Sequence, residues 1–173
     1  MNIKKTSAVP YLDAIGDYAG CLSSRYQDYP LVQKLIETLI GEQRKSVEHL
    51  LGYNAPGLAP DEVIHYCVFS AHNIESLARS FFELFVEKEA AVEMMGPPYE
   101  SIDESIEEIR NGEFRRKLDR MNGSLKSIDT ESHSLVYQFR RSVRHGRNRQ
   151  TFPKTMAVLR EIRKELRFKN WEQ

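Results

Sequence analysis

The chain has 173 residues, of which 40% are hydrophobic and 29% are charged, and its 25 basic and 25 acidic side chains give a net charge of zero. This is the composition of an ordinary globular protein, and the length suits a single helical domain over 1–173 with a full apolar core. No apolar run is long enough to cross a membrane, and Pro10 and Asp13 interrupt the N-terminus before a signal-peptide core can form. We therefore expect a cytoplasmic protein that does not contact membranes.

Apolar residues recur at helical spacing in six stretches of the chain, after residues 1–9, which we expect to form a flexible tail. The predicted helices are 10–24, 30–52, 61–95, 101–110, 129–146 and a last helix that begins at Phe152-Pro153. No stretch alternates apolar and polar residues as a strand would. The pattern therefore predicts an all-α fold, a bundle of about six helices.

Turn and capping residues set the boundaries of these helices. The glycines and prolines of 52–60 predict a linker, and Ser101 with Glu104 predicts a capping box. Asn122-Gly123 is a turn signal, after which Asp129 or Thr130 would cap the next helix.

Two cysteines, Cys21 and Cys67, are far apart in the sequence and lack metal-ligand spacing. They are typical of buried thiols in a reducing compartment rather than of a disulfide framework.

The neutral net charge conceals a strong asymmetry along the chain. Between Phe139 and Asn170 there are eleven lysines and arginines but only two glutamates, a local charge of +9. The compensating acidic residues are concentrated between Glu75 and Glu108. Two interpretations of the acidic stretch stay open: it pairs with the basic stretch across a subunit interface, or each stretch is a solvated face.

The densest positive charge follows an apolar helical stripe, in the segment Gln138 to Arg149. Five arginines and one histidine occupy this segment. Such a concentration of cations costs self-repulsion, so it favours an anionic partner. The structural alternative is a solvated basic face, with His145 as the last helical residue before a glycine cap.

Arg140, His145 and Gly146 have the spacing of a known signature: an arginine, four intervening residues, a histidine and a glycine. In this the segment resembles the HEPN superfamily of α-helical proteins, although the position after the arginine, commonly Asn, Asp or His in that family, is Arg141 here. The resemblance implies a metal-independent endoribonuclease that acts as a homodimer, with Arg140 and His145 as catalytic residues. It also implies a role such as that of a toxin or defence component, with an antitoxin or other partner protein.

The two residue types suit the chemistry that the resemblance implies. RNA cleavage without a metal needs a group that exchanges a proton near neutral pH and a fixed cation beside the phosphate. His145 and Arg140 supply these, while Arg141, Arg144, Arg147 and Arg149 are the candidate RNA-binding residues. Arg140 and His145 project about 140° apart on one ideal helix, so a composite groove between two copies would bring them to one phosphate better than one helix can. Arg141, four residues before His145, lies on the same face of the helix as His145. It is therefore a candidate to replace or assist Arg140 as the cation.

A second group of polar residues, His65, His72, Glu75 and Arg79, lies on the predicted helix 61–95. Two turns separate the histidines, so one metal ion could not bridge them without other elements, and we favour core or subunit-contact histidines. We expect no metal site and no cofactor.

Two further functions compete with the ribonuclease. The first is a non-catalytic helical module that binds nucleic acid or an acidic protein through the basic segment 140–169. The second is an interaction or assembly protein that uses the acidic residues between 83 and 108.

Overall fold

The computed structural model describes residues 13, 16–52, 60–97, 99–144 and 152–171, and for 46–52, 60–70 and 144 it describes the backbone only. A helical segment over 16–24 precedes five helices: α2 (Pro30–Gly52), α3 (Pro60–Glu93), α4 (Ile102–Arg110), α5 (Glu113–Arg144) and α6 (Pro153–Leu166). There is no strand in these ranges. The predicted all-α helical bundle is confirmed.

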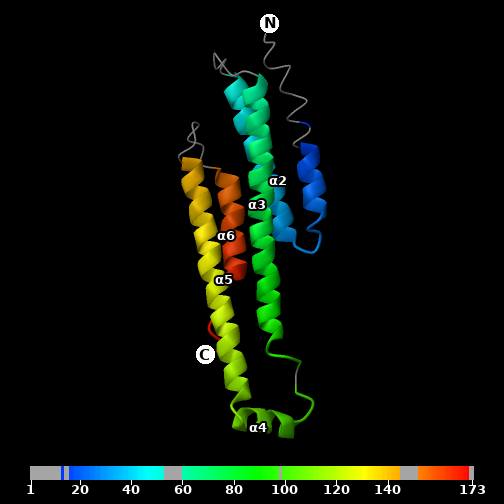
Figure 1. Ribbon diagram of the computed structural model, residues 1–173, viewed down its shortest axis with the longest axis vertical. Coiled ribbons are helices and arrows are strands. Elements are labelled where there is room, and N and C mark those ends of the chain that lie inside the picture. The colour runs from blue at the N-terminus through cyan, green and yellow to red at the C-terminus, as the bar shows by residue number, and fades with distance from the viewer. Residues whose placement is uncertain (1–12, 14–15, 53–59, 98, 145–151, 172–173) are drawn as a thin grey trace.

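Four helices lie along the long axis of the molecule, and α4 crosses at one end (Figure 1). Packing joins α2 to α3, α3 to α5, α5 to α6 and α6 back to α2, and α3 also contacts α6 across the bundle. Successive long helices run in opposite directions, and the segment 16–24 lies beside the bundle. None of the helices in the described residues is long and apolar enough to cross a bilayer.

The core consists of two adjoining clusters of buried apolar side chains. One joins α3, α5 and α6 with Leu35 of α2, and its members include Phe81, Leu84, Met121, Leu125, Ile128, Leu159 and Ile162. The other joins the segment 16–24 to α2 and α3 through Ala19, Leu22, Val32, Ile36, Leu39, Ile74 and Ala78. Three half-buried side chains, Leu77, Phe85 and Phe139, pack against both clusters, so the two form a continuous interior.

The predicted turn at Asn122-Gly123, with a helix start at Asp129 or Thr130, is wrong. α5 runs without interruption through these residues for 32 residues, about 48 Å. Leu118, Met121, Leu125 and Ile128 are buried against α3 and α6 at helical spacing on both sides of the glycine. Their burial outweighs the cost of about 1 kcal/mol for one glycine inside a helix.

The capping box at the start of α4 forms with one difference from the expectation. The Ser101 hydroxyl accepts a hydrogen bond from the Glu104 amide at 3.2 Å, as predicted. The Glu104 carboxylate accepts from the Glu100 amide at 3.3 Å, one residue further upstream than a standard box.

The expectation of a buried thiol is wrong for Cys21, which is exposed. Ala19 and Leu22 are the inward residues of that turn, and Cys21 lies on the opposite side of the helix. Cys67 is among the residues whose side chains are not described.

A carboxylate from a different helix caps the start of α6. Phe152, at the N-cap position, has a left-handed backbone (φ 44°) and provides no side-chain hydrogen bond. Instead the Glu42 carboxylate of α2 accepts from the amides of Lys154 and Thr155 at 2.8 and 2.9 Å, and from the buried Thr155 hydroxyl at 2.6 Å. Negative charge at this position is favoured by the partial positive charge of a helix N-terminus. Glu42 therefore fixes α6 against α2.

Glu42→Ala should lower the free energy of unfolding by about 2 kcal/mol, because two helix amides and the buried Thr155 hydroxyl lose their acceptor. Urea denaturation followed by circular dichroism measures this change. Glu161→Ala is the matched control: Glu161 also joins α6 to α2, through an exposed ion pair with Lys34 at 3.0 Å, and should cost less than about 1 kcal/mol. Equal losses in the two variants would contradict the proposed importance of the cap.

Candidate nucleic-acid interface

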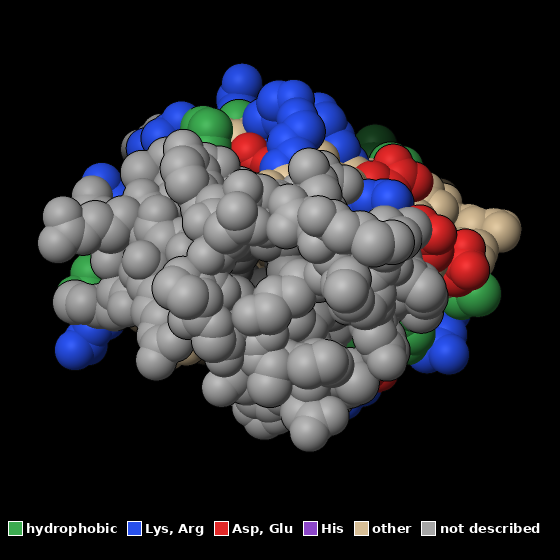
Figure 2. Space-filling model, turned by 90° about the horizontal axis from the view of Figure 1, so that it is seen from above, with side chains coloured by type: hydrophobic (Ala, Val, Ile, Leu, Met, Phe, Trp, Pro, Cys, Tyr) green, Lys and Arg blue, Asp and Glu red, His purple; other side chains and the backbone are tan. Residues whose placement is uncertain are grey.

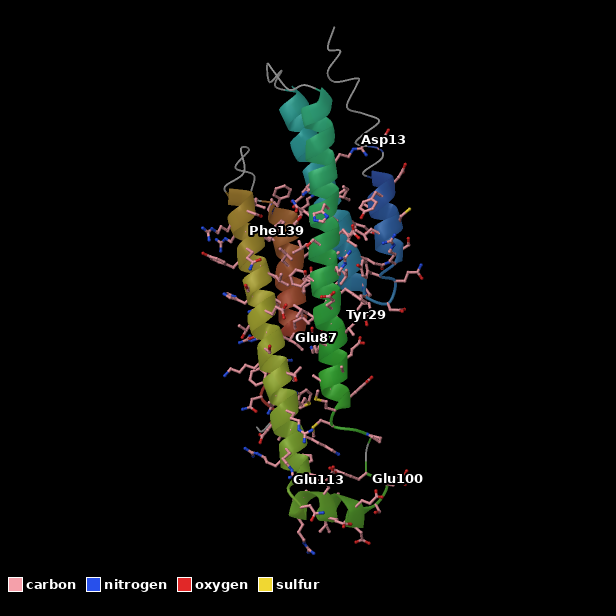
Figure 3. The ribbon with its side chains drawn as sticks, viewed as in Figure 1. Asp13, Tyr29, Glu87, Glu100, Glu113 and Phe139 are labelled. Atoms are coloured by element: carbon pink, nitrogen blue, oxygen red, sulfur yellow. The ribbon has the colours of Figure 1, made fainter. Side chains whose placement is uncertain are left out.

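Apolar contacts on one side fix the C-terminal third of α5. Leu135, Val136 and Phe139 pack against the core, as their spacing predicts. The Phe139 ring meets that of Phe152 in an edge-to-face contact with centroids 6.2 Å apart. Figure 3 marks Phe139 near the upper end of α5. These contacts determine which side of α5 is buried against the core and which side is exposed to solvent.

Hydrogen bonds from one arginine of α6 join it to α5 near Asp129 and Ser132. The Arg163 guanidinium of α6 donates to the carboxylate of Asp129 at 2.8 Å and to its carbonyl oxygen at 2.5 Å. It also donates to the hydroxyl of the buried Ser132 at 2.6 Å. Asp129 is thus the ion-pair partner of Arg163, and its charge is not available to neutralise the arginines further along α5.

The side of α5 that faces away from the core carries His133, Tyr137, Arg140 and Arg141, which we call the α5 outer face. All four are exposed, and 59% of the surface of Tyr137 is accessible. At 100° per residue these positions fall within an arc of about 100°, and they span about 12 Å of the helix axis. An aromatic ring is therefore surrounded by one imidazole and two guanidinium groups.

The arginines of this face are not neutralised within the described part of the protein. Neither Arg140 nor Arg141 forms an ion pair or a side-chain hydrogen bond with a described residue, unlike Arg163. Their place near the C-terminus of a helix is electrostatically favourable, which provides a structural reason for two cations there. Seen from the end where α5 finishes, Lys and Arg side chains appear on several parts of the rim of the molecule, most densely along the top of the picture, and Asp and Glu side chains lie mainly on the right (Figure 2).

A shallow open hollow continues the α5 outer face toward the middle of the helix. It is lined by Gly123, Lys126, Ser127, Thr130, Glu131 and Ser134, all from α5. Thr130 and Ser134 share the sector of Tyr137 and Arg141 on the helix. Its lining carries one cation, Lys126, and one anion, Glu131.

The other predicted site residues lie mostly outside the described part of the chain. Arg144 is the last residue of α5, and its side chain is not described. His145, Arg147 and Arg149 fall in the undescribed range 145–151. The structure thus brings Arg140 and Arg141 to one exposed face, and the relation between Arg140 and His145 stays a prediction.

Two residues of the α5 outer face, His133 and Tyr137, were not among the predicted site residues. Their helical spacing from Arg140 and Arg141 is a signal that the sequence contains, because His133, Tyr137 and Arg141 follow one another at intervals of four. That signal becomes informative only when α5 is one continuous helix whose inward side is known.

The group His65, His72 and Glu75 shows no metal-site geometry in the described residues. No three His, Cys, Asp or Glu side chains there are arranged to hold a metal ion. His72 is exposed, which contradicts a core role, and the His65 side chain is not described. Glu75 instead accepts a hydrogen bond from the Tyr18 hydroxyl at 2.6 Å and pairs with Arg79 at 2.9 Å. Its carboxylate serves to hold the segment 16–24 on α3.

Comparison with known proteins gives no family for this chain: no protein-family model matches it, and no similar protein was found among curated sequences or solved structures. The function is therefore argued from the site itself.

The Tyr18 to Glu75 contact should make stability depend on pH. The Tyr18 hydrogen bond is the main reason that the pKa of Glu75 lies below its usual value. A carboxyl group whose pKa is lower in the folded protein stabilises the fold above its unfolded-state pKa, and that contribution disappears as pH falls through the folded-state pKa. Tyr18→Phe should thus lower the melting temperature at neutral pH, and the difference from the unmodified protein should shrink on acidification below the usual Glu range.

Thermal unfolding from neutral to acidic pH measures this difference, with Tyr137→Phe as the control because Tyr137 is exposed on α5. A Tyr18→Phe deficit that stays constant across this pH range would show that the Glu75 charge plays no part in the contact.

Proposed function

We propose that this protein binds single-stranded RNA on the α5 outer face and cleaves it without a metal through Arg140 and His145. The observation that carries the binding proposal is the exposed Tyr137 ring, which lies on one side of a helix between His133 and two arginines, Arg140 and Arg141, that form no ion pair with any residue the structure describes. The cleavage step rests on the HEPN resemblance of the segment from Arg140 to Gly146.

Phosphate and base would be recognised by different members of this face. Guanidinium groups bind phosphate oxygens with two parallel hydrogen bonds, and each contact displaces a counterion. An exposed tyrosine ring can stack on a base, which contributes about 1–3 kcal/mol per base. Bases inside a duplex are already stacked on one another, so the arrangement favours a single strand over a double helix.

In cleavage of this kind a base takes the proton of the 2′-hydroxyl, and the 2′-oxygen bonds to phosphorus to give a cyclic phosphate. The bond between phosphorus and the 5′-oxygen breaks as that oxygen takes up a proton, and a cation offsets the charge that develops on the phosphate. Arg140 supplies the cation and His145 exchanges the proton. Since Arg140 and His145 project about 140° apart if the helix continues, a homodimer with Arg140 from one copy and His145 from the other is the arrangement we favour. His133, seven residues before Arg140 on the same face, is a second imidazole within reach of a bound strand.

A second candidate function keeps the binding and omits the cleavage. The α5 outer face supports a non-catalytic RNA-binding module equally well, because arginine contacts and stacking need no proton transfer. A toxin or defence role, with an antitoxin as partner, rests on the resemblance alone.

The binding proposal predicts the salt dependence of RNA affinity. Arg140→Gln and Arg141→Gln should each reduce the slope of log affinity against log salt by about 0.7, because each removes one phosphate contact to a single strand. Fluorescence anisotropy with a single-stranded RNA of about eight nucleotides, at a series of salt concentrations, measures the slope. Arg120→Gln is the matched control, since Arg120 is exposed on the same helix about 30 Å away.

Tyr137 distinguishes stacking from simple charge attraction in the same assay. Tyr137→Phe keeps the ring and should bind RNA with wild-type affinity, while Tyr137→Ser should bind RNA about tenfold more weakly. Equal slopes for all arginine variants and the control, or equal affinity for Tyr137→Ser, would exclude this face as the RNA site.

The cleavage proposal predicts activity in the presence of EDTA. His145→Ala should reduce the cleavage rate at least about 100-fold, because general acid–base catalysis by one group is worth that much, while RNA affinity is retained. Single-turnover cleavage of a labelled single strand measures the rate. His133→Ala, made in parallel, reports whether the second imidazole takes part.

Each outcome has a definite meaning. Loss of cleavage in His133→Ala but not in His145→Ala would transfer the proton-exchange role to His133 and contradict the assignment of His145. Binding without cleavage in the unmodified protein would favour the non-catalytic module.

A further inference from the structure

Two polar contacts mark the line along which α5 and α6 meet at the surface. Arg163 of α6 pairs with Asp129 of α5 at 2.8 Å, and the Asn122 side chain of α5 donates a hydrogen bond to the side chain of Asn170, just after α6, at 3.3 Å. The two helices are antiparallel, and seven residues separate the two contacts on both sides. The helices therefore keep one register between these contacts, so positions beside the line can be matched.

The exposed cations of α6 lie beside this line, on the side away from the core. Arg167, Arg160 and Lys164 are exposed and lie about 40°, 60° and 100° around the helix from Arg163. The buried residues of α6 all lie in the opposite sense from Arg163. None of the three cations forms an ion pair or a side-chain hydrogen bond with a described residue.

Four exposed residues of α5 lie on the same side of the line: Lys126, His133, Tyr137 and Arg140. They fall within about 20–80° of Asp129 around the helix, again away from the core. By the shared register, Arg160 is about level with His133, and Arg167 is about level with Lys126. These four residues and the three cations of α6 form one strip, which we call the α5–α6 surface.

No carboxylate in the described ranges of α5 and α6 opposes the positive charge of this strip between its two contacts. Asp129 is paired with Arg163. Glu131, Glu161 and Glu165 are each two residues from Asp129 or Arg163, so they lie about 160° around their helices from the line. Glu161 accordingly pairs with a lysine of α2. The α5–α6 surface therefore suits an extended polyanion.

An exposed tryptophan lies at the far end of the α5–α6 surface from Arg140. Trp171, the one tryptophan of the chain, follows Asn170 directly, and 58% of its surface is accessible. Figure 1 shows the C-terminal segment beside α5, where Asn170 contacts Asn122. Tyr137 lies about 22 Å along α5 from Asn122. Exposed aromatic rings therefore lie toward both ends of the row of cations.

We infer that a single RNA strand lies along the α5–α6 surface, with phosphates on Arg160, Lys164 and Arg167 and with bases stacked on Tyr137 and Trp171. Proteins bind single strands in this way, with cations that follow the backbone and aromatic rings on which bases stack. The span of about 22 Å corresponds to about seven nucleotides at the stacked spacing of about 3.4 Å. The inference rests on the proposed RNA binding at the α5 outer face and extends that site to α6 and the C-terminal segment.

Tryptophan emission tests the position of the strand, because Trp171 is the only tryptophan of the full-length protein. A 2′-O-methyl RNA of about eight nucleotides, which cannot be cleaved by attack of the 2′-oxygen, should quench this emission as a base stacks on the ring. Inorganic polyphosphate has phosphates but no bases, so it should bind and leave the emission unchanged. In fluorescence anisotropy, Trp171→Ser should bind this RNA about tenfold more weakly, whereas Trp171→Phe, which keeps a ring, should bind with wild-type affinity.

The cations of α6 are tested by the salt dependence of RNA affinity. Arg160→Gln and Lys164→Gln should each lower the slope of log affinity against log salt by about 0.7, because each removes one phosphate contact. Lys154→Gln is the matched control, since Lys154 is exposed on the same helix about 120° from Arg160. Circular dichroism of each variant verifies that the helices are retained.

The inference is wrong if the α6 variants match Lys154→Gln, or if the RNA leaves the tryptophan emission unchanged. Quenching of equal size by RNA and polyphosphate would also contradict it, because Trp171 would then respond to charge rather than to a stacked base. In each case the RNA-binding proposal still stands if Arg140→Gln and Arg141→Gln lower the slope. Unchanged slopes in the variants of both helices would contradict both.

Discussion

The Glu42 carboxylate caps the N-terminus of α6 and, together with the buried side of that helix, positions α6 in the bundle. α6 begins at a residue with a left-handed backbone and without a side-chain cap of its own, so its first amides need an acceptor from elsewhere. Glu42 provides that acceptor from α2 and so joins two helices that are more than 100 residues apart in the sequence. With α6 fixed, the rings of Phe152 and Phe139 meet, and Phe139 sets the rotation of the last turns of α5. The exposure of Arg140 and Arg141 follows from that rotation.

Opposite charges occupy different parts of the bundle. Exposed glutamates follow α3 and α4, whereas exposed lysines and arginines predominate at the C-terminal end of α5 and along α6. The apolar interior between these helices keeps the two sets apart, and described ion pairs such as Arg163 with Asp129 neutralise only some of the cations. The two ends of the bundle therefore differ in character: one carries an aromatic ring with exposed arginines on α5, and the other carries the exposed carboxylates of α4. Surfaces of this kind select different partners, because a polyanion is attracted to the first and repelled by the second.

The sequence alone determined the all-α class and most helix boundaries, because apolar residues at helical spacing and the prolines and glycines between them are local signals. It also determined where positive charge accumulates, and the capping box at Ser101. Tertiary structure decided the continuity of α5 through Gly123, since the burial of Met121 and Leu125 outweighs a local turn preference. It likewise decided that Glu42 caps a helix more than 100 residues away, and that Tyr137 and His133 share a face with Arg140. Both depend on which side of a helix is buried and on contacts between distant segments, which no local pattern specifies.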